Sequence, residues 1–192
     1  MTIKRSFKLA AFSLAFILNA NLSFASPSVK QTLDFQVSPL QPIHICQINE
    51  DYIKTLANDL NIEKYDQELA KRDKRSVGHT YKKHVAKTGE ELLQLIEKDK
   101  KLRVASSYYD QLTAEYVIKK GIQLDSKRII GWMNSPDTDK VLKLKYKTDK
   151  PVGFSVVRGD AKVVDSSAAY IILKKDHDCN FIILTSYPLS GE

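Results

Sequence analysis

The chain has 192 residues, of which 28% are charged and 43% hydrophobic, and its formal net charge is +7. This size suits a single domain with an extension. The sequence contains no internal repeat, no low-complexity segment, no Gly-rich phosphate loop and no HExxH motif. These absences exclude repeat architectures, P-loop nucleotide binding and the common zinc-protease site.

The N-terminal segment has the features of a secretory signal peptide. Three basic residues precede an apolar run, "LAAFSLAFILNANL", and the small residues "SFA" follow soon after it. We expect residues 1–25 to be removed by cleavage near Ala25/Ser26, which gives a secreted or periplasmic location. The apolar run is interrupted by polar residues and is short for a bilayer, so we expect no stable membrane anchor; a retained anchor is the alternative. Cleavage removes three basic residues and no acidic residue, so it lowers the net charge from +7 to about +4.

The two cysteines, Cys46 and Cys179, lie far apart in the sequence. In an oxidising compartment such a pair predicts one disulfide, worth roughly 4–5 kcal/mol of stability in the chain-entropy description. Each cysteine follows a histidine by two positions, His44 and His177, so a tetrahedral zinc site is the alternative. We favour the disulfide, because thiols in an oxidising medium tend to pair, and we expect no metal and no cofactor.

Residues 26–42 show little periodicity, and helical spacing of apolar residues begins only at Asn49. Residues 49–69 predict one helix with Asn49 as its cap, and "KRDKRSVG" (residues 71–78) interrupts the pattern as a linker or exposed loop. We therefore divide the mature chain into an extension with one helix, residues 26–75, and a domain, residues 76–192.

Further short helices are predicted within the domain. Thr88 and Glu91 form a capping box at the start of "TGEELLQLIEKD". Asp110 can cap the start of "DQLTAEYVIKKG" and Gly121 its end. The segment "DSKRIIGWM" offers another turn or two of helix.

The apolar period changes to two after Pro136. In "VLKLKYK" two leucines and a tyrosine alternate with lysines, and "AAYIILKK" and "FIILTSYP" flank the polar loop "DHDCN" as a hairpin. Helices first and antiparallel strands afterwards predict the α+β fold class, with N-terminal helices followed by an antiparallel sheet.

The positive charge is concentrated in one segment. Residues 71–103 contain eleven Lys or Arg against five Asp or Glu. Such a segment attracts polyanions, either nucleic acid or an anionic membrane surface. The alternative is a solvated helical face without a ligand.

Four chemically useful side chains can meet if the helices and strands form as predicted. If "HTYKKHVAK" is helical, His84 and Lys87 share one face, and Thr185 and Tyr187 point to the same side of the last strand. An imidazole, an ammonium, a hydroxyl and a phenol suit phosphodiester cleavage without a metal. Taken singly, each is more often an ordinary surface or strand residue than a catalytic one.

Three segments of the chain resemble a known family. They are "VGHTYKKHVAKTGEELLQLI", "ASSYYDQLTAEYVI" and "YIILKKDHDCNFIILTSYP". In this order and spacing, over roughly Ser76 to Leu189, they are similar to the bacterial ribonuclease A-like toxin domain found at the C-termini of contact-dependent growth inhibition proteins and other polymorphic toxins. The resemblance implies the kidney-shaped α+β fold of ribonuclease A without its dense disulfides, RNA as the substrate, and metal-free cleavage.

The resemblance also assigns roles to residues. His84 matches the histidine of the family's "HVGKT" and would be the principal acid or base. Thr185 and Tyr187 match the Thr and Tyr of "LTAYP", which line the family's active site, and His79 matches the "GHT" histidine. The family pattern has an arginine where this chain has Leu95.

Three basic residues of the charged segment are candidates for substrate binding. They are Lys83, Lys87 and Arg103. Leu95 cannot supply the positive charge that the family's arginine would offer the transition state. Lys87 or Arg103 would have to supply this charge instead.

These observations predict a secreted, metal-independent endoribonuclease of the toxin or effector type, which cleaves RNA by 2′-OH transesterification. We expect a monomer, with a cognate immunity protein as a possible partner. The alternative is a catalytically inactive basic binding protein of the same fold that holds a polyanion or an envelope component.

Overall fold

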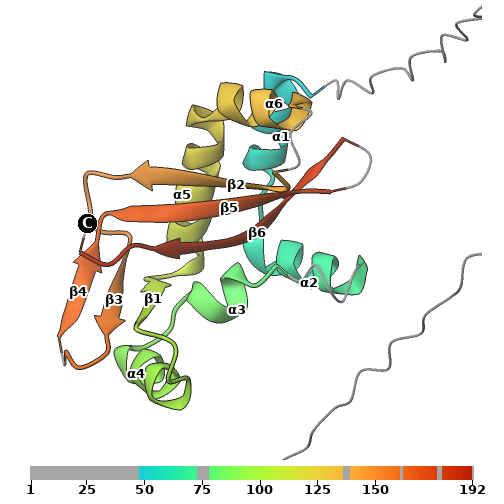
Figure 1. Ribbon diagram of the computed structural model, residues 1–192. Helices are drawn as coiled ribbons and strands as arrows, with labels where there is room; N and C mark the ends of the chain where they lie inside the picture. Colours follow the sequence, from blue (N-terminus) through green and yellow to red (C-terminus); the bar gives the residue numbers. More distant parts are fainter. Residues whose placement is uncertain (1–47, 73–77, 136–138, 161, 177–178, 192) are drawn as a thin grey trace, which may run out of the picture. The chain divides into compact units, whose positions relative to one another are not determined.

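The computed structural model (Figure 1) describes residues 48–72, 78–135, 139–160, 162–176 and 179–191. All of them belong to one unit, Ile43–Glu192. The predicted signal peptide, most of the predicted linker, Cys46 and both histidines of the alternative zinc site lie outside the described residues. In the described part of the chain, no helix is long and apolar enough to cross a membrane.

The described residues form helices and antiparallel strands, which confirms the α+β class. The helices are α1 (Glu50–Asn58), α2 (Ile62–Arg72), α3 (Thr80–His84), α4 (Gly89–Lys98), α5 (Gln111–Leu124) and α6 (Ser126–Asn134). The strands are β1 (Val104–Tyr108), β2 (Val141–Lys147), β3 (Gly153–Val157), β4 (Val163–Ser166), β5 (Ala168–Lys175) and β6 (Phe181–Pro188).

The predicted helix caps are present. The Asn49 side chain accepts a hydrogen bond from the Tyr52 backbone amide at 2.9 Å, and Thr88 and Glu91 form the reciprocal capping box of α4. Asp110 caps α5 through the Thr113 amide at 2.7 Å. Each cap satisfies amides that have no partner within the helix, so these short signals locate helix starts reliably.

Two helix boundaries differ from the prediction. The single helix expected over residues 49–69 is two helices, because α1 ends at Asn58 and the side chain of Asn61 caps α2 by accepting from the Lys64 amide at 2.9 Å. Gly121 does not end α5, which continues to Leu124. A Cβ at Gly121 would lie 2.3 Å from Ile171 Cδ1, so the glycine allows α5 to approach the sheet closely.

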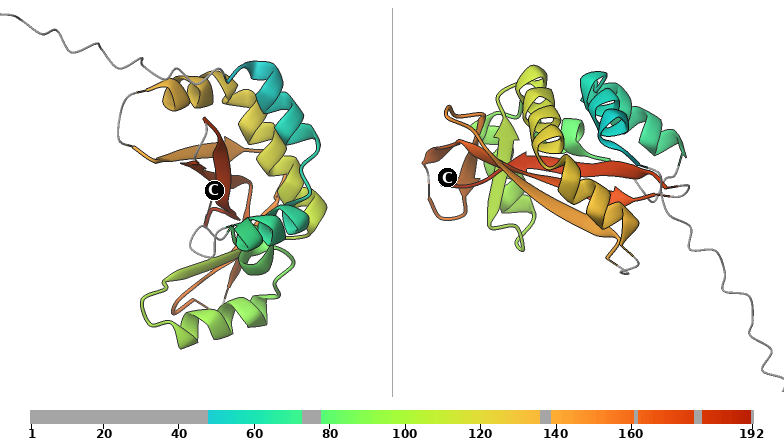
Figure 2. Two further views of the ribbon diagram at one scale, coloured as in Figure 1. Left: turned by 90° about the vertical axis from the view of Figure 1, so that its right-hand side faces the viewer. Right: turned by 90° about the horizontal axis from the view of Figure 1, so that it is seen from above.

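The strands form two three-stranded antiparallel sheets, with strand orders β1-β3-β4 and β2-β5-β6 (Figures 1 and 2). Strand β3 lies in "VGFSVV", where apolar residues alternate only weakly, and strands β1 and β4 are additions to the predicted set. β1 is the sequence "VASSY", whose two serines are buried. Polar residues at buried strand positions hide the period-two signal, so the sequence pattern did not indicate this strand.

The larger apolar core lies on one face of the β2-β5-β6 sheet. Helices α1, α2, α5 and α6 cover that face (Figure 2), and Ile53, Ile62, Ile118, Leu144 and Ile171 are all completely buried there. Residues 48–72 therefore share a core with the domain that follows them. The division into an extension and a domain at residues 75 and 76 remains a prediction.

Candidate active site

Helix α3 is fixed on the edge of β6 by polar contacts near its N-terminus. The buried Thr80 hydroxyl accepts a hydrogen bond from the Ser186 amide at 2.9 Å. The Tyr81 amide donates to Asp66 Oδ2 at 2.8 Å, and burial raises the pKa of Asp66 to about 6. These contacts fix where the far end of α3, at His84, meets β6.

The chain leaves the helical conformation directly after His84. Val85 is extended and forms an isolated parallel bridge with Tyr108, and Ala86 adopts φ 52°. The Lys87 amide donates to Ser107 Oγ at 2.9 Å, and the Lys87 ammonium lies 3.9 Å from Glu91 Oε1. The expectation that His84 and Lys87 share one helical face is therefore wrong, because α3 ends before Lys87.

His84 is oriented by a hydrogen bond to the first sheet. Its Nδ1 lies 3.2 Å from the carbonyl oxygen of Ser106 in β1. A carbonyl can only accept, so Nδ1 carries the hydrogen, and in the neutral ring Nε2 is left with the lone pair. His84 is thus set up to take a proton at Nε2.

The surroundings of His84 keep its ring neutral. Burial lowers the pKa of His84 to about 4 from its ordinary 6.5. The hydrogen bond to Ser106 raises the pKa, and the charges of His79 and Lys83 lower it further, so the lowering effects dominate. At neutral pH the ring is therefore an uncharged base.

The ring of Tyr187 lies next to the ring of His84. The centroids of their rings are 5.4 Å apart, and the Tyr187 ring also meets Tyr170 edge-on at 6.0 Å. Thr185, two residues earlier in β6, is only 8% exposed, and its Oγ1 has no hydrogen-bond partner in the described part of the chain. A buried hydroxyl without a partner costs free energy unless a ligand satisfies it.

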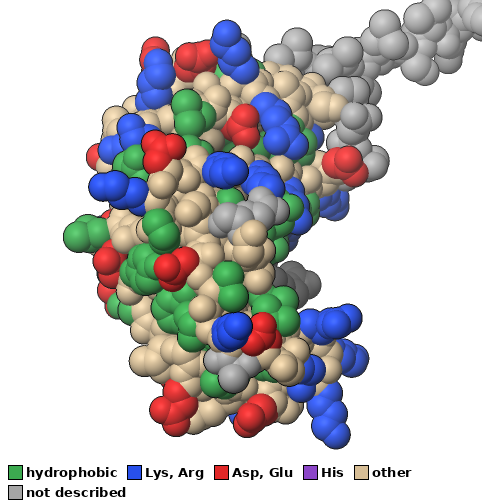
Figure 3. Space-filling model, turned by 90° about the vertical axis from the view of Figure 1, so that its left-hand side faces the viewer, with side chains coloured by type: hydrophobic (Ala, Val, Ile, Leu, Met, Phe, Trp, Pro, Cys, Tyr) green, Lys and Arg blue, Asp and Glu red, His purple; other side chains and the backbone are tan. Residues whose placement is uncertain are grey.

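A cleft of about 420 Å³ opens beside this pair. Lys83, His84, Ser106 and Tyr187 line it together with apolar side chains from α4 and the segment that leads into β1. Leu95, which is 44% exposed, is one of them. Figure 3 shows that the molecule is hollowed on one side, with Lys and Arg side chains along the margins of the hollow.

The other predicted site residues lie further out. The ring of His79 is 6.2 Å from that of His84, but His79 is not among the residues that line the cleft. Arg103 is exposed and also lies outside the lining. Of the three predicted substrate-binding residues, only Lys83 reaches the cleft.

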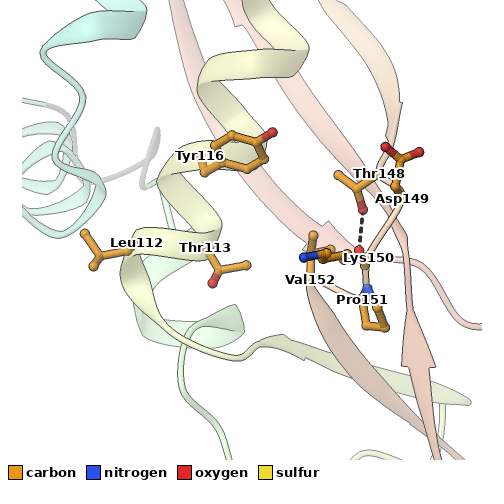
Figure 4. A pocket seen from close by; sticks show the side chains of 8 residues that line it. All are labelled: Leu112, Thr113, Tyr116, Thr148, Asp149, Lys150, Pro151 and Val152. Atoms are coloured by element: carbon orange, nitrogen blue, oxygen red, sulfur yellow. Dashed lines mark hydrogen bonds between the residues drawn. The ribbon is translucent and has the colours of Figure 1, made fainter.

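A second cavity, of about 500 Å³, lies at the start of α5 and the turn between β2 and β3 (Figure 4). Leu112, Tyr116, Asp149 and Lys150 are among its lining residues. Neither His79 nor His84 lines it, and the Thr148 hydroxyl in its wall donates to the Lys150 carbonyl oxygen at 2.7 Å. Of the predicted catalytic residues, His84 and Tyr187 line the first cleft, whereas Thr185 and His79 line neither cavity. The first cleft is therefore the candidate site.

Sequence reasoning missed three residues beside His84 and Tyr187. Ser106 contributes through its backbone carbonyl, which no side-chain motif can indicate. Tyr170 contacts Tyr187, and the Lys143 ammonium lies 3.4 Å from the centre of the Tyr170 ring. The alternation of "VLKLKYK" separates Lys143 from the leucines, but only strand pairing shows which residues of other strands share its face.

Comparison with known proteins identifies the family of the chain. Residues 78–188 match the family model of the bacterial CdiA-CT RNAse A domain. The crystal structure of a CdiA-CT/CdiI complex from Y. kristensenii 33638 is similar to this chain, with 33% sequence identity and a TM-score of 0.52 over 55% of this chain and 94% of that chain. No curated protein matches the chain. Because the matched residues span more than half of the sequence and include α3, β1 and β6, this chain belongs to the family of bacterial CdiA-CT RNAse A domains.

Proposed function

We propose that this chain is a toxin-type endoribonuclease that cleaves RNA without a metal, by attack of a 2′-oxygen on the adjacent phosphate. One observation carries the proposal. His84 donates from Nδ1 to the Ser106 carbonyl at 3.2 Å, and so presents a neutral Nε2 in a cleft that it shares with Tyr187. A neutral base held in a fixed tautomer is what proton abstraction from a ribose hydroxyl requires.

The reaction runs in one displacement. Nε2 of His84 takes the proton of the 2′-OH, the 2′-oxygen forms a bond to phosphorus, and the bond from phosphorus to the 5′-oxygen breaks. Lys83, His84 and Tyr187 are the titratable side chains among the residues that line the cleft. We assign the proton of the leaving 5′-oxygen to the Tyr187 hydroxyl. The products carry a 2′,3′-cyclic phosphate and a 5′-hydroxyl, and solvent returns the proton from His84 to Tyr187.

Two further side chains support the phosphate. The buried Thr185 hydroxyl has no partner in the described part of the chain, so we assign it as a donor to a non-bridging oxygen. Lys83 supplies a positive charge from the cleft wall. His79 acts indirectly, since its charge lowers the pKa of His84 and helps to keep the base neutral.

A second candidate function follows from Leu95. This side chain lines the cleft where the family pattern has an arginine, so the charge that an arginine would offer the phosphorane is absent from that position. Removing one donor that stabilises transition-state charge lowers kcat by about 10²–10³-fold. The alternative is therefore a protein of this fold that binds RNA without cleaving it.

Incubation with total RNA in the presence of a chelator distinguishes the two functions. We expect cleavage that the chelator does not change, and products whose 3′ ends are 2′,3′-cyclic phosphates. Ends with a linear 3′-phosphate from the outset, or cleavage that stops in chelator, would contradict the mechanism. Binding without any cleavage across pH and salt would establish the binding protein instead.

We also propose a secreted or periplasmic protein with a cognate immunity partner. The signal-like residues 1–25 support the location. The related crystal structure is of a CdiA-CT/CdiI complex, which supports a partner of the CdiI type. Co-purification of the toxin chain with a protein that abolishes RNA cleavage would test the partner.

The predicted pairing of Cys46 with Cys179 is part of the same proposal. Cys179 is not a free thiol, and Cys46 lies outside the described residues. We expect thiol titration of the denatured, unreduced protein to find no free sulfhydryl, because an oxidising compartment favours the pair. Two free thiols, or zinc bound in a one-to-one ratio, would contradict the pairing.

A further inference from the structure

Strand β2 presents a row of lysines on the face of the β2-β5-β6 sheet opposite the main core. Lys143, Lys145 and Lys147 are exposed, and they alternate with the buried Leu142 and Leu144. The three strands together contain five lysines and no acidic residue. The charged side chains of these three strands are therefore all positive.

The strand register connects this row with the candidate active site. Lys145 pairs with Tyr170, and Tyr170 pairs with Tyr187. One row further along, Lys143 pairs with Ile172, and Ile172 pairs with Thr185. Directly paired residues in antiparallel strands point to the same face. The lysines of β2 and the site residues of β6 therefore share one surface, with β5 between them.

Side-chain contacts show how close the two ends of this surface are. The Lys143 ammonium lies 3.4 Å from the centre of the Tyr170 ring, whose centroid is 6.0 Å from that of Tyr187, which in turn is 5.4 Å from His84. An aromatic ring holds a cation by its negative face, so Lys143 is positioned before any ligand arrives. The Thr185 hydroxyl, which has no hydrogen-bond partner in the described part of the chain, lies on the same face at the β6 end of the row that contains Lys143 and Ile172, and it independently indicates a ligand on this face.

We propose that this face binds the RNA strand beside the scissile phosphate, with Lys143 and Lys145 on successive phosphates and Tyr170 as an aromatic platform. Proteins that hold single strands combine a basic groove with aromatic rings in this way. The strand runs from the cleft across β5 to β2, on the side of Tyr187 away from Leu95. The inference rests on the proposed function, because it takes the cleft as the place of cleavage.

The test compares two double variants with the same charge change. Lys143→Gln/Lys145→Gln removes the proposed phosphate contacts, and Lys120→Gln/Lys127→Gln removes two exposed lysines from α5 and α6, which cover the other face of the sheet. Binding is measured with a 2′-O-methyl RNA oligonucleotide, which has no free 2′-OH, over a range of salt concentrations. Cleavage is measured with the unmodified oligonucleotide.

We expect the Lys143/Lys145 variant to bind about tenfold more weakly, and its slope of log affinity against log salt to flatten by about 1.4, since each single-strand phosphate contact contributes about 0.7. KM should rise while kcat changes by less than about threefold, because these contacts lie beside the reacting phosphate. The Lys120/Lys127 variant should keep the wild-type slope.

The outcomes separate this inference from the proposed function. If the wild type cleaves RNA and the Lys143/Lys145 variant keeps its affinity and slope, the inference is wrong and the nuclease stands; the lysine face is then left to a protein partner. If both double variants flatten the slope equally, net charge explains the effect and the inference is also wrong. If the wild type binds with the expected dependence on Lys143 and Lys145 but never cleaves, RNA binding by the lysine face is confirmed, whereas the nuclease, and with it the placement of this face beside a scissile phosphate, is wrong.

Discussion

Replacing His84 with alanine is expected to lower the rate of RNA cleavage by about 10²–10⁴-fold, the usual contribution of general acid–base catalysis. The imidazole is the base in the proposed displacement, and Ser106 holds it in the required tautomer. The phosphate contacts assigned to Thr185 and Lys83 do not involve His84. The loss should therefore fall on kcat, with binding of an uncleavable oligonucleotide little altered.

His79→Ala is the matched comparison for His84→Ala, since the two rings lie 6.2 Å apart but only His84 lines the cleft. It should cost much less activity, because His79 acts through the pKa of His84. Near-UV circular dichroism of both variants checks that the fold is retained. Cleavage by His84→Ala at the wild-type rate would show that another group is the base, even if the protein is a nuclease.

Signals that depend on a few neighbouring residues predicted this fold well. The caps of α1, α4 and α5 are local hydrogen bonds between a side chain and an amide three residues away, so the sequence contains all of their determinants. The alternation in β2 is equally local. The end of α3 is different, because the chain leaves the helix to pair with β1, and Ala86 donates to the distant Tyr108 carbonyl. Lys87 was misplaced for that reason.

The candidate site could be predicted only as far as its side chains carry their own chemistry. His84, Thr185 and Tyr187 stood out as residue types that suit phosphate chemistry. The Ser106 carbonyl, which fixes the tautomer of His84, is a backbone group positioned by strand pairing. Lys143 lies near the site through two strand pairings, and no spacing along the sequence determines these.

The second large expected effect is on the acid side of the pH–rate profile. His84 acts as a base only when neutral, and burial lowers its pKa to about 4. The value of kcat/KM should therefore be half-maximal near pH 4 on the acid side. A base with the ordinary histidine pKa of 6.5 would lose about 30-fold by pH 5, whereas this protein should lose little. A half-maximal point near pH 6.5 would mean that the cleft leaves His84 solvated, or that a different group is the base.

Stability against pH tests the same pKa without relying on activity. Between pH 6.5 and about 4 the unfolded chain protonates His84 and the folded chain does not, so this group destabilises the fold as the pH falls, by up to about 3 kcal/mol. Asp66 acts in the opposite direction, because its pKa is raised to about 6 and the folded state takes up its proton first. Because the two contributions oppose each other, the wild-type free energy of unfolding plotted against pH shows neither of them separately. The difference between His84→Ala and the wild type in urea unfolding cancels the contribution of Asp66, and it should favour the variant increasingly from pH 6.5 down to pH 4. A difference that does not change with pH would show that His84 titrates alike in the folded and unfolded chains, and the neutral base of the mechanism would then lose its physical support.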